Sequence, residues 1–341
     1  MEKEELSYAV ERIEHMEKMF DEVKNAFEND PNFNKNETLQ KKVSLLTQYM
    51  ESGQWLRDFE LDEKGKLPDN LKRGILSEDG LYNLICDIEQ SKKSDPLKRL
   101  FDKNEILFAI IWIAVYVLGF GNADMLSESL GFPKLITVIF GALLSVILLL
   151  FIKANGLFGY FGLCRPEKKP KDFLFYIPLL LVSTASIWSG ISFEIKPLTA
   201  VLSVLSMCFV GFLEELIFRG MLFTGMAKNG IKSAIIVSSL TFGVGHIVNL
   251  LMGAPVFETL LQLVYASAAG FCYTAIFYYG KSILPCVLSH ALINSLSVFG
   301  AEATTVEMII ISAIQTAINI GYGIYILKKK EAVYSVSCGF L

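Results

Sequence analysis

Residues 134–153 read KLITVIFGALLSVILLLFIK, with a lysine at each end and eighteen uncharged, mostly apolar residues between them. A helix needs about 20 predominantly apolar residues to cross the hydrocarbon core of a bilayer. This stretch therefore predicts a transmembrane helix, and with it a membrane protein rather than a soluble enzyme.

Seven other stretches approach the same length, so we expect an all-α, polytopic body of about eight transmembrane helices. The fourth stretch is interrupted by charged residues. The sixth and seventh are divided only by Gly280-Lys281-Ser282, which predicts a tight hairpin. The predicted segments are 105–121, 134–153, 173–190, 198–227, 232–251, 257–279, 283–300 and 306–327.

The charged residues are distributed unevenly along the chain. Residues 1–105 hold 17 Lys and Arg and 24 Asp and Glu, which is 41 of the 66 charged side chains; the other 236 residues share 25. The first part thus has a net charge of 17 − 24 = −7 and offers no basic surface for nucleic acid. The six cysteines are scattered without a C-x-x-C pair and indicate no disulfide framework.

These patterns divide the chain into three regions. We expect residues 1–104 to form a soluble, mostly helical extension, 105–327 the membrane body, and 328–341 a short tail. We find no catalytic motif in the first region. Its helices are indicated by two apolar stripes at helical spacing: Leu6, Val10, Ile13 and Phe20, then Leu39, Val43, Leu46 and Met50.

Lysine and arginine in the short connections predict the orientation, because cytoplasmic loops carry an excess of these residues. The connections after segments one, three, five and seven contain only Lys134 and Lys196, both at segment edges. The other connections are richer in basic residues, so we expect both termini in the cytoplasm and a multi-pass protein of the cell membrane. Those residues are Arg165, Lys168, Lys169, Lys171, Lys228, Lys281, Lys328, Lys329 and Lys330.

Few ionisable residues lie within the apolar segments, and each costs at least ~2.5 kcal/mol at mid-bilayer, so each is a functional candidate. The fourth segment contains Glu214, Glu215 and Arg219. Glu215 and Arg219 are i, i+4 neighbours on a helix and can neutralise each other. Glu214 is rotated by about 100° from that pair. A free carboxylate in an apolar cavity suits a general base or acid.

Two further segments carry the only histidines of the membrane body. Phe242 precedes His246 by one helical turn and can form a wall of a cavity, while His290 and Asn294 share a helix face. The asparagine can orient an imidazole or donate to an oxyanion. Each pattern alone is weak, and a single membrane histidine is as often a packing residue as a catalytic one.

The predicted depths of these residues in the membrane indicate that the three segments contribute to the same site. At about 1.5 Å per residue, Glu214 and His246 each lie about 21 Å from the flanking lysines Lys228 and Lys232. His290 lies about 14 Å from Lys281 on the same reckoning. Three separate segments thus bring acid, imidazole and amide groups to a similar depth, which predicts one shared site.

The ordered set Glu-Glu-x-x-x-Arg, Phe-x-x-x-His and His-x-x-x-Asn on successive apolar segments resembles the CAAX protease and bacteriocin-processing family. This is the Abi family of intramembrane glutamate endopeptidases, related to the type II CAAX prenyl endopeptidases. All three motifs are complete, as Glu214-Glu215 with Arg219, Phe242 with His246, and His290 with Asn294. The resemblance covers residues 170–300 and does not extend to the N-terminal region.

The resemblance implies a peptidase that activates water with a glutamate and a histidine, without a serine or cysteine nucleophile. Glu214 is then the principal base and His246 helps to hold the water, although either Glu214 or Glu215 can serve as the base. His290 and Asn294 form the oxyanion site, and donors aimed at developing charge are usually the largest electrostatic contribution. Arg219 holds Glu215.

No cofactor is expected, although zinc is an alternative, because Glu, His and His are plausible ligands with water in the fourth place. The body has no H-E-x-x-H motif, and a metal leaves Asn294 and the second glutamate without evident roles. The expected partners are the lipid bilayer and a membrane-associated or lipidated peptide.

Two other classes of function fit the same residues. One is a non-catalytic membrane protein that binds a bacteriocin-like peptide and confers immunity. The other is a proton-coupled transporter that uses the acid and the imidazoles as a relay. The transporter fits less well because the hydrophobic pattern shows no internal repeat.

Overall fold

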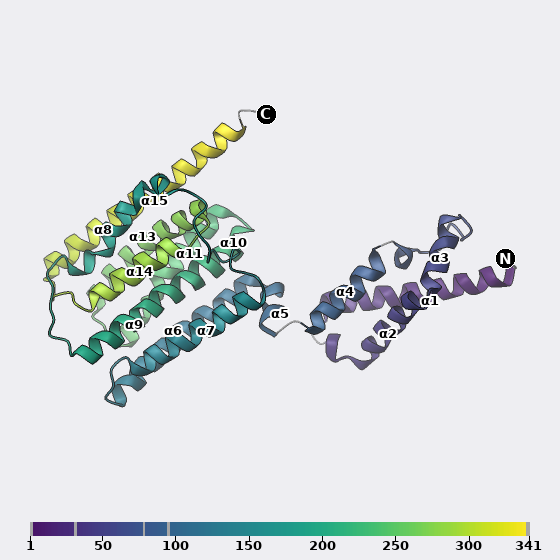
Figure 1. Cartoon of the computed structure of the whole chain (residues 1–341), viewed down its shortest axis with the longest axis horizontal. Helices are drawn as coiled ribbons and strands as arrows, with labels where there is room; N and C mark the ends of the chain where they lie inside the picture. The colour runs from purple at the N-terminus through teal and green to yellow at the C-terminus, as the bar shows by residue number, and fades with distance from the viewer. Residues whose placement is uncertain (1–2, 31–32, 78, 94–95, 339–341) are drawn as a thin grey trace. The chain divides into compact units, whose positions relative to one another are not determined.

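The computed structural model describes residues 3–30, 33–77, 79–93 and 96–338, which are mostly helical (Figure 1). Within these ranges the only extended pairing is a single antiparallel bridge between Ile191 and Gly300. The predicted all-α, polytopic class is confirmed. The chain divides into two compact units, Met1–Arg99 and Leu100–Leu341.

The N-terminal unit is a small helical domain with its own apolar core. Both stripes found in the sequence face this core: Ile13 and Phe20 from the first and Val43 and Leu46 from the second are buried. The elements are α1 Lys3–Asn29, η1 Phe33–Lys35, α2 Glu37–Glu51, α3 Gln54–Glu63, η2 Gly74–Leu76 and α4 Gly80–Lys93.

A buried carboxylate connects three helices of this unit. Asp58 on α3 has no exposed surface and accepts two hydrogen bonds from Arg12 of α1, from Nε at 2.9 Å and from Nη2 at 2.5 Å. The hydroxyl of Tyr49 on α2 donates to the same carboxylate at 2.7 Å. Burial, followed by this bond to Asp58, raises the pKa of Tyr49 well above its ordinary value. The carboxylate is thus fully partnered, as a buried charge must be.

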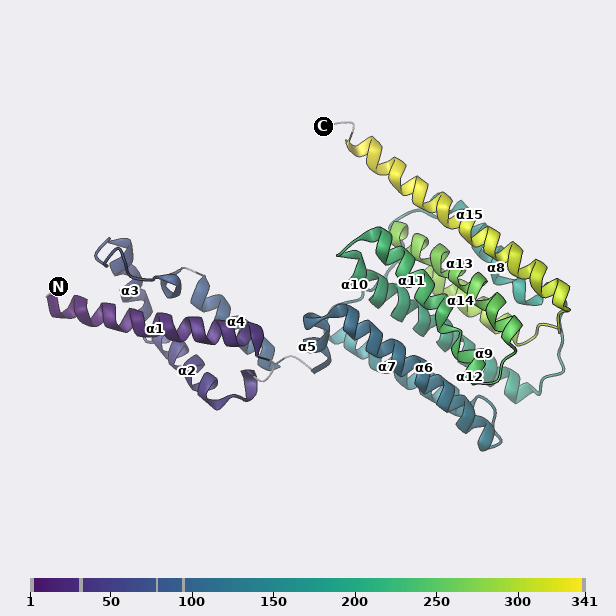
Figure 2. The same ribbon diagram turned by 180° about the vertical axis from the view of Figure 1, so that it is seen from behind.

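The second unit is a bundle of long helices that run alongside one another (Figures 1 and 2). Helix α13 packs against α11 and α15, and α9 packs against α7 and α14. The elements are α5 Pro96–Lys103, α6 Glu105–Ser129, α7 Leu135–Ala154, η3 Pro170–Tyr176, α8 Ile177–Ser183, η4 Ala185–Ile187, α9 Pro197–Glu214, η5 Glu215–Phe223, α10 Thr224–Ala227, α11 Ile231–Gly245, α12 Val248–Leu251, α13 Val256–Gly280, α14 Leu284–Ser297 and α15 Thr305–Cys338.

Within the described ranges, seven helical segments are long and apolar enough to cross a membrane, so the chain is a multi-pass membrane protein. Each begins within three residues of a predicted segment. Their bounds are Glu105–Ser129, Leu135–Ala154, Pro170–Ile187, Pro197–Ala227, Ile231–Leu251, Val256–Gly280 and Thr305–Lys330.

The seventh predicted segment, 283–300, needs correction, because α14 has only 14 residues and is about 21 Å long. The helix ends where the following backbone pairs with another loop instead. Ser192 donates its N–H to the carbonyl of Phe299, and Ala301 donates to Gly190. A Cβ at Gly300 would lie 2.4 Å from the carbonyl oxygen of Ser186, so only glycine fits there.

The third segment, predicted as one helix over 173–190, consists of three short helical elements, η3, α8 and η4. Leu174, Phe175 and Tyr176 all have positive φ angles, and α8 begins directly after them with Pro178 in its first turn. Proline favours the first turn of a helix because it lacks the N–H that the interior requires.

The connections rich in lysine meet at one end of the bundle. Ile283, at the hairpin after α13, donates its N–H to Gly162 in the loop after α7. Lys228, after α10, pairs with Glu105 at the start of α6 at 2.6 Å. The loops after η4 and α14 pair with each other at a different place. These contacts place the lysine-rich connections after α7, α10 and α13 together, and the connections after η4 and α14 together.

We expect Asp58→Ala to destabilise the N-terminal unit by about 3–5 kcal/mol, because it leaves Arg12 without its buried partner. Pulse proteolysis of the full-length protein in urea measures the change. Glu60→Ala removes the exposed pair with Lys64 on the same helix and serves as the control, with no measurable effect expected. Equal effects of the two substitutions would contradict this account of the buried carboxylate.

Candidate active site

The two glutamates lie where α9 changes its helical geometry. Helix α9 ends at Glu214 and continues without a break into the π-helix η5, which begins at Glu215. All nine residues of η5 are buried. π-Helical turns are rare and occur frequently at functional sites. The two adjacent carboxylates have different neighbours.

A glycine allows α9 to approach α14 closely, one helical turn before the first glutamate. A Cβ at Gly211 would lie 2.6 Å from the backbone nitrogen and 2.8 Å from the Cα of Ala291. Real Cβ contacts are not that short, so the two backbones can meet only at a glycine. Ala291 follows His290 directly. The contact therefore brings the histidine of α14 to the glutamates of α9 and η5.

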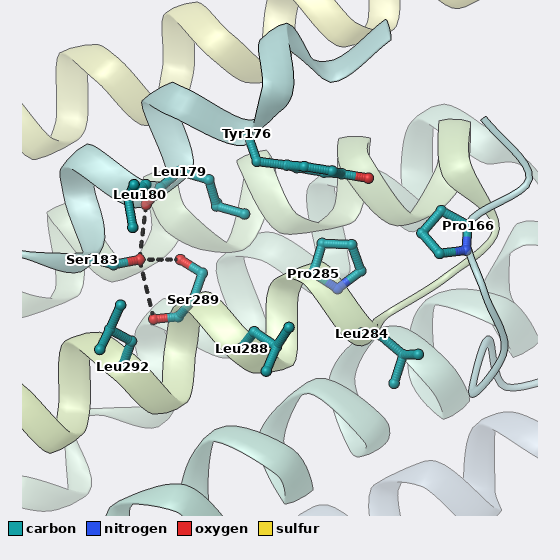
Figure 3. Close-up of a pocket in the computed structure, with 10 residues that line it drawn as sticks. All are labelled: Pro166, Tyr176, Leu179, Leu180, Ser183, Leu284, Pro285, Leu288, Ser289 and Leu292. Carbon is teal, nitrogen blue, oxygen red and sulfur yellow. Dashed lines mark hydrogen bonds between the residues drawn. The ribbon is translucent and has the colours of Figure 1, made fainter. Parts of the chain in front are cut away.

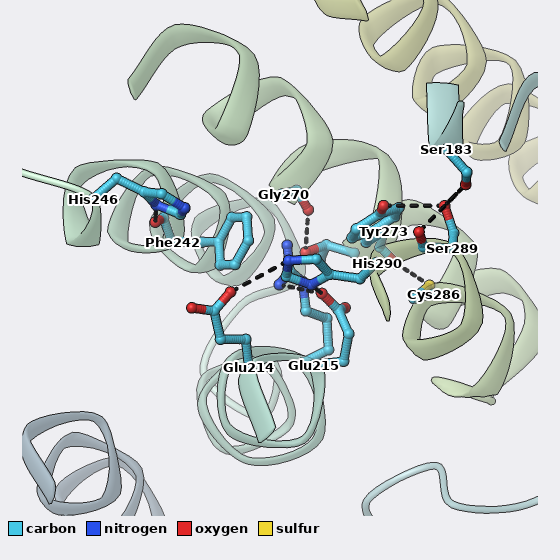
Figure 4. Close-up of polar contacts among 12 residues, drawn as sticks. Ser183, Glu214, Glu215, Phe242, His246, Gly270, Tyr273, Cys286, Ser289 and His290 are labelled. Carbon is cyan, nitrogen blue, oxygen red and sulfur yellow. Dashed lines mark hydrogen bonds and ion pairs between the residues drawn. The ribbon is translucent and has the colours of Figure 1, made fainter. Parts of the chain in front are cut away.

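Glu215 is held by two partners inside the bundle (Figure 4). Arg219 donates from Nη1 to Glu215 Oε1 at 3.0 Å, and both side chains are fully buried. His290 Nδ1 lies 2.8 Å from the same oxygen. Since a carboxylate oxygen can only accept, Nδ1 carries the hydrogen and Nε2 is the free nitrogen of the ring. Glu215 thus fixes the orientation of the imidazole.

Glu214 faces the other nitrogen of the same histidine. Its Oε2 lies 3.4 Å from His290 Nε2, and its Oε1 accepts a hydrogen bond from the hydroxyl of Tyr116 on α6 at 2.6 Å. Its side chain keeps 12% of its surface exposed, whereas that of Glu215 keeps none. Of the two glutamates, Glu214 is therefore the one that can be reached.

The charges of this cluster almost balance. When ionised, Glu214, Glu215 and Arg219 together carry a net charge of −1, and a buried net charge is costly. Within the cluster Arg219 compensates one carboxylate, that of Glu215, and Glu214 Oε2 faces His290 Nε2 at 3.4 Å.

The Phe242 side chain separates the two histidines (Figure 4). Its ring makes edge contacts with His246, at 5.4 Å between centroids, and with His290, at 5.6 Å. The Arg219 guanidinium carbon lies 4.1 Å from the centre of this ring. Phe242 is thus a wall of the cluster, and cation–π attraction adds to the support of the buried arginine.

His246 and Asn294 do not join the hydrogen-bonded cluster. His246 follows the last residue of α11, is half-buried, and its Nδ1 lies 3.1 Å from the carbonyl oxygen of Phe242 in its own chain segment. Asn294 is half-buried on α14, and within the described residues its side chain has no hydrogen bond. Of the predicted set, the structure joins Glu214, Glu215, Arg219 and His290 directly.

Residues 196–296 match the family described as type II CAAX prenyl endopeptidase Rce1-like. The match covers 101 of the 341 residues. The family is one of proteases, so the predicted resemblance is confirmed, and the Rce1-like segment contains every predicted site residue.

The two other comparisons were negative, and the N-terminal unit has a separate match. Residues 13–94 match a domain of unknown function, DUF4298. Comparison with curated proteins gave no match, and comparison with solved structures gave none.

A second layer of polar residues lies behind His290 in the Rce1-like segment. The ring of Tyr273 on α13 lies 5.9 Å from the imidazole, and its hydroxyl is 3.1 Å from that of Ser289. Ser289 in turn is 2.7 Å from the hydroxyl of Ser183 on α8. These two serines border an apolar groove of about 380 Å³ between α8 and α14 (Figure 3). The layer fixes the start of α14 against its neighbours.

Sequence reasoning missed Tyr116 and Tyr273. Each lies in an apolar run, without a charged residue, histidine or amide at i+3 or i+4 that would identify it as part of a polar site. The contact between Tyr116 and Glu214 joins residues 98 positions apart. Only the packing of α6 against η5 shows it.

No group of three or more His, Cys, Asp or Glu within the described residues is arranged to hold a metal ion. His246, which would be the third member of a Glu, His and His set, lies beyond the Phe242 ring from His290. One carboxylate oxygen of Glu215 contacts Arg219 and His290, and one oxygen of Glu214 contacts Tyr116.

We expect Gly211→Ala to destabilise the membrane unit by about 1–3 kcal/mol, because the added methyl group forces α9 away from α14. Thermal unfolding of the protein in detergent measures the loss. Gly321→Ala on α15 is the control, since a Cβ there meets no atom within 4 Å. Equal melting temperatures for the Gly211 variant and the wild type would show that the helix contact is not tight.

Proposed function

We propose that the chain is an intramembrane peptidase that hydrolyses a peptide bond of a membrane-associated or lipidated peptide. The observation that carries the proposal is the contact between Glu214 and His290 inside the bundle, with Glu215 and Arg219 paired behind it. A carboxylate and an imidazole held side by side are the groups that general acid–base hydrolysis requires.

In this proposal Glu214 is the general base. Its carboxylate takes a proton from a water molecule, and the resulting hydroxide attacks the peptide carbonyl carbon. The tetrahedral intermediate then collapses, its carbon–nitrogen bond breaks, and the proton held at Glu214 passes to the leaving amine. The water supplies the oxygen of the new carboxyl group and both hydrogens are accounted for, so no nucleophilic side chain is needed.

His290 and Asn294 stabilise the oxyanion in this scheme. With Nδ1–H fixed on Glu215, His290 can present a protonated Nε2 to the developing negative charge. Asn294 lies one turn further along α14 and can add an amide donor. Its amide has no competing hydrogen bond among the described residues, which suits a group that acts only when the substrate is bound.

The role proposed for His246 requires water or movement. This histidine helps to hold the attacking water, and the Phe242 ring lies between it and the other imidazole. A water molecule bridging past the edge of that ring can reach Glu214. We further propose that the lysine-rich end of the bundle faces the cytoplasm, together with residues 1–104.

We expect Glu214→Gln to lower peptide hydrolysis by at least about 10³-fold, because an amide cannot accept the proton from water. The measurement is a proteomic comparison of membrane peptides from cells that express the wild type or the variant at equal levels. Glu302→Gln, in an exposed loop of the same unit, is the control and should match the wild type.

The same comparison separates the other classes of function. Identical peptides from the wild type and the Glu214 variant would contradict the peptidase. If protection against a bacteriocin-like peptide then persisted in the variant, it would support the immunity protein. Proton-coupled uptake into liposomes would support the transporter.

We expect a strong chelator to leave peptide hydrolysis by the purified protein unchanged, because the proposed water activation depends on Glu214. Activity is measured before and after treatment, and again after zinc is added back. If activity is lost with the chelator and returns when zinc is added, a metal-dependent mechanism is supported and the glutamate mechanism is contradicted.

A further inference from the structure

Tyr116 lies outside the segment that matches the Rce1-like family, yet it touches the central carboxylate. It lies on α6, and its hydroxyl donates to Glu214 Oε1 at 2.6 Å. The side chain is buried, and its ring packs at 4.8 Å against Phe120, one turn further along α6. The hydroxyl is therefore held by packing at a fixed place opposite the end of α9.

The hydrogen bond distinguishes the two oxygens of Glu214. Oε1 is occupied by Tyr116, while Oε2 is buried without a hydrogen bond and lies 3.4 Å from His290 Nε2. A phenol that donates to one oxygen fixes the plane of the carboxylate and leaves the lone pairs of the other oxygen directed at the imidazole.

The bond also favours one ionisation state. A hydroxyl that donates to a carboxylate stabilises the ionised form, and bonds to charged groups are stronger than neutral ones. The other ionisable groups around Glu214 are Glu215 and Arg219 on η5, His290 on α14 and His246 after α11, with Asp124 two turns further along α6. Among these and Tyr116, only Tyr116 lies within hydrogen-bonding distance of Oε1 in the described part of the chain.

We propose that Tyr116 is a positioning residue of the site: its hydroxyl stabilises Glu214 as a carboxylate and directs Oε2 at the imidazole of His290. The catalytic meaning of this arrangement rests on the proposed peptidase function. The state of the carboxylate does not, and it can be measured without a substrate. Helix α6 is thereby part of the site.

The test uses dicyclohexylcarbodiimide, an apolar reagent that modifies protonated carboxyl groups within membranes. Full-length wild type and Tyr116→Phe are treated in liposomes at pH 7, and modification at Glu214 and Glu215 is quantified by tandem mass spectrometry. We expect about tenfold more modification at Glu214 in the variant, because a lost bond to a charged group shifts protonation by that order. Modification at Glu215 should not change.

Tyr322→Phe is the matched control. Its hydroxyl donates to the carbonyl of Phe173 at 2.6 Å, and its burial is similar to that of Tyr116, but it does not touch the glutamates. We expect wild-type modification in this variant. The proposal is overturned if Tyr116→Phe does not raise modification at Glu214, or if Tyr322→Phe raises it equally, since a general loosening of the bundle would then be the cause.

A kinetic measurement tests whether Tyr116 contributes to catalysis. It uses a peptide whose cleavage depends on Glu214 in the proteomic comparison. We expect Tyr116→Phe to lower kcat by about tenfold while KM stays within about twofold, because the hydroxyl touches the base and not the peptide. A rise in KM alone would contradict the positioning role. If the proteomic comparison finds no such peptide, the peptidase function fails, and the modification experiment still decides whether Tyr116 holds Glu214 ionised.

Discussion

The membrane unit depends on neutralising charge where water is scarce. Glu215 and Arg219 have no exposed surface, and either one alone would be an uncompensated charge within a bundle that lipid surrounds. Their ion pair allows a polar cluster to exist at that depth. The ion pair also positions His290, because the imidazole takes its orientation from the same carboxylate oxygen that Arg219 contacts. Phe242 covers the guanidinium and contacts both histidines, so one aromatic ring supports the charge and shapes the site around it.

Much of this arrangement could be predicted from the sequence, and the reasons are physical. Seven of the predicted transmembrane segments start within three residues of the helical segments in the structure. Charged residues are excluded from the hydrocarbon core, so such segments stand out in the sequence as long apolar runs. The pairing of Glu215 with Arg219 follows from helical spacing alone and survives the π-helical geometry. Similar depth and the ordered motifs predict one shared site for Glu214, His246, His290 and Asn294, and of these only Glu214 and His290 make contact in the described part of the chain.

Other features depend on contacts that no local pattern records. The short α14 results from backbone pairing between the loops around Ser192 and Phe299, which lie more than 100 residues apart. The tyrosine on Glu214 comes from a helix whose sequence reads as an ordinary apolar span. The separation of His246 from His290 by Phe242 depends on the ending of α11 at Gly245, whereas the sequence pattern continues to Leu251. In each case the structure depends on tertiary contacts that the periodicity of apolar residues in the sequence does not reveal.

The length of α14 has a consequence for the surrounding lipid. A helix of about 21 Å is shorter than the roughly 30 Å of a typical hydrocarbon core, and lipids respond to such mismatch by thinning locally. Headgroups and their hydration then come closer to the ends of this helix than to those of its longer neighbours. Roughly 10 Å of helix therefore separates the residue that carries the imidazole, His290, from either end of α14, and that short distance sets how far a substrate must enter the bundle to meet it.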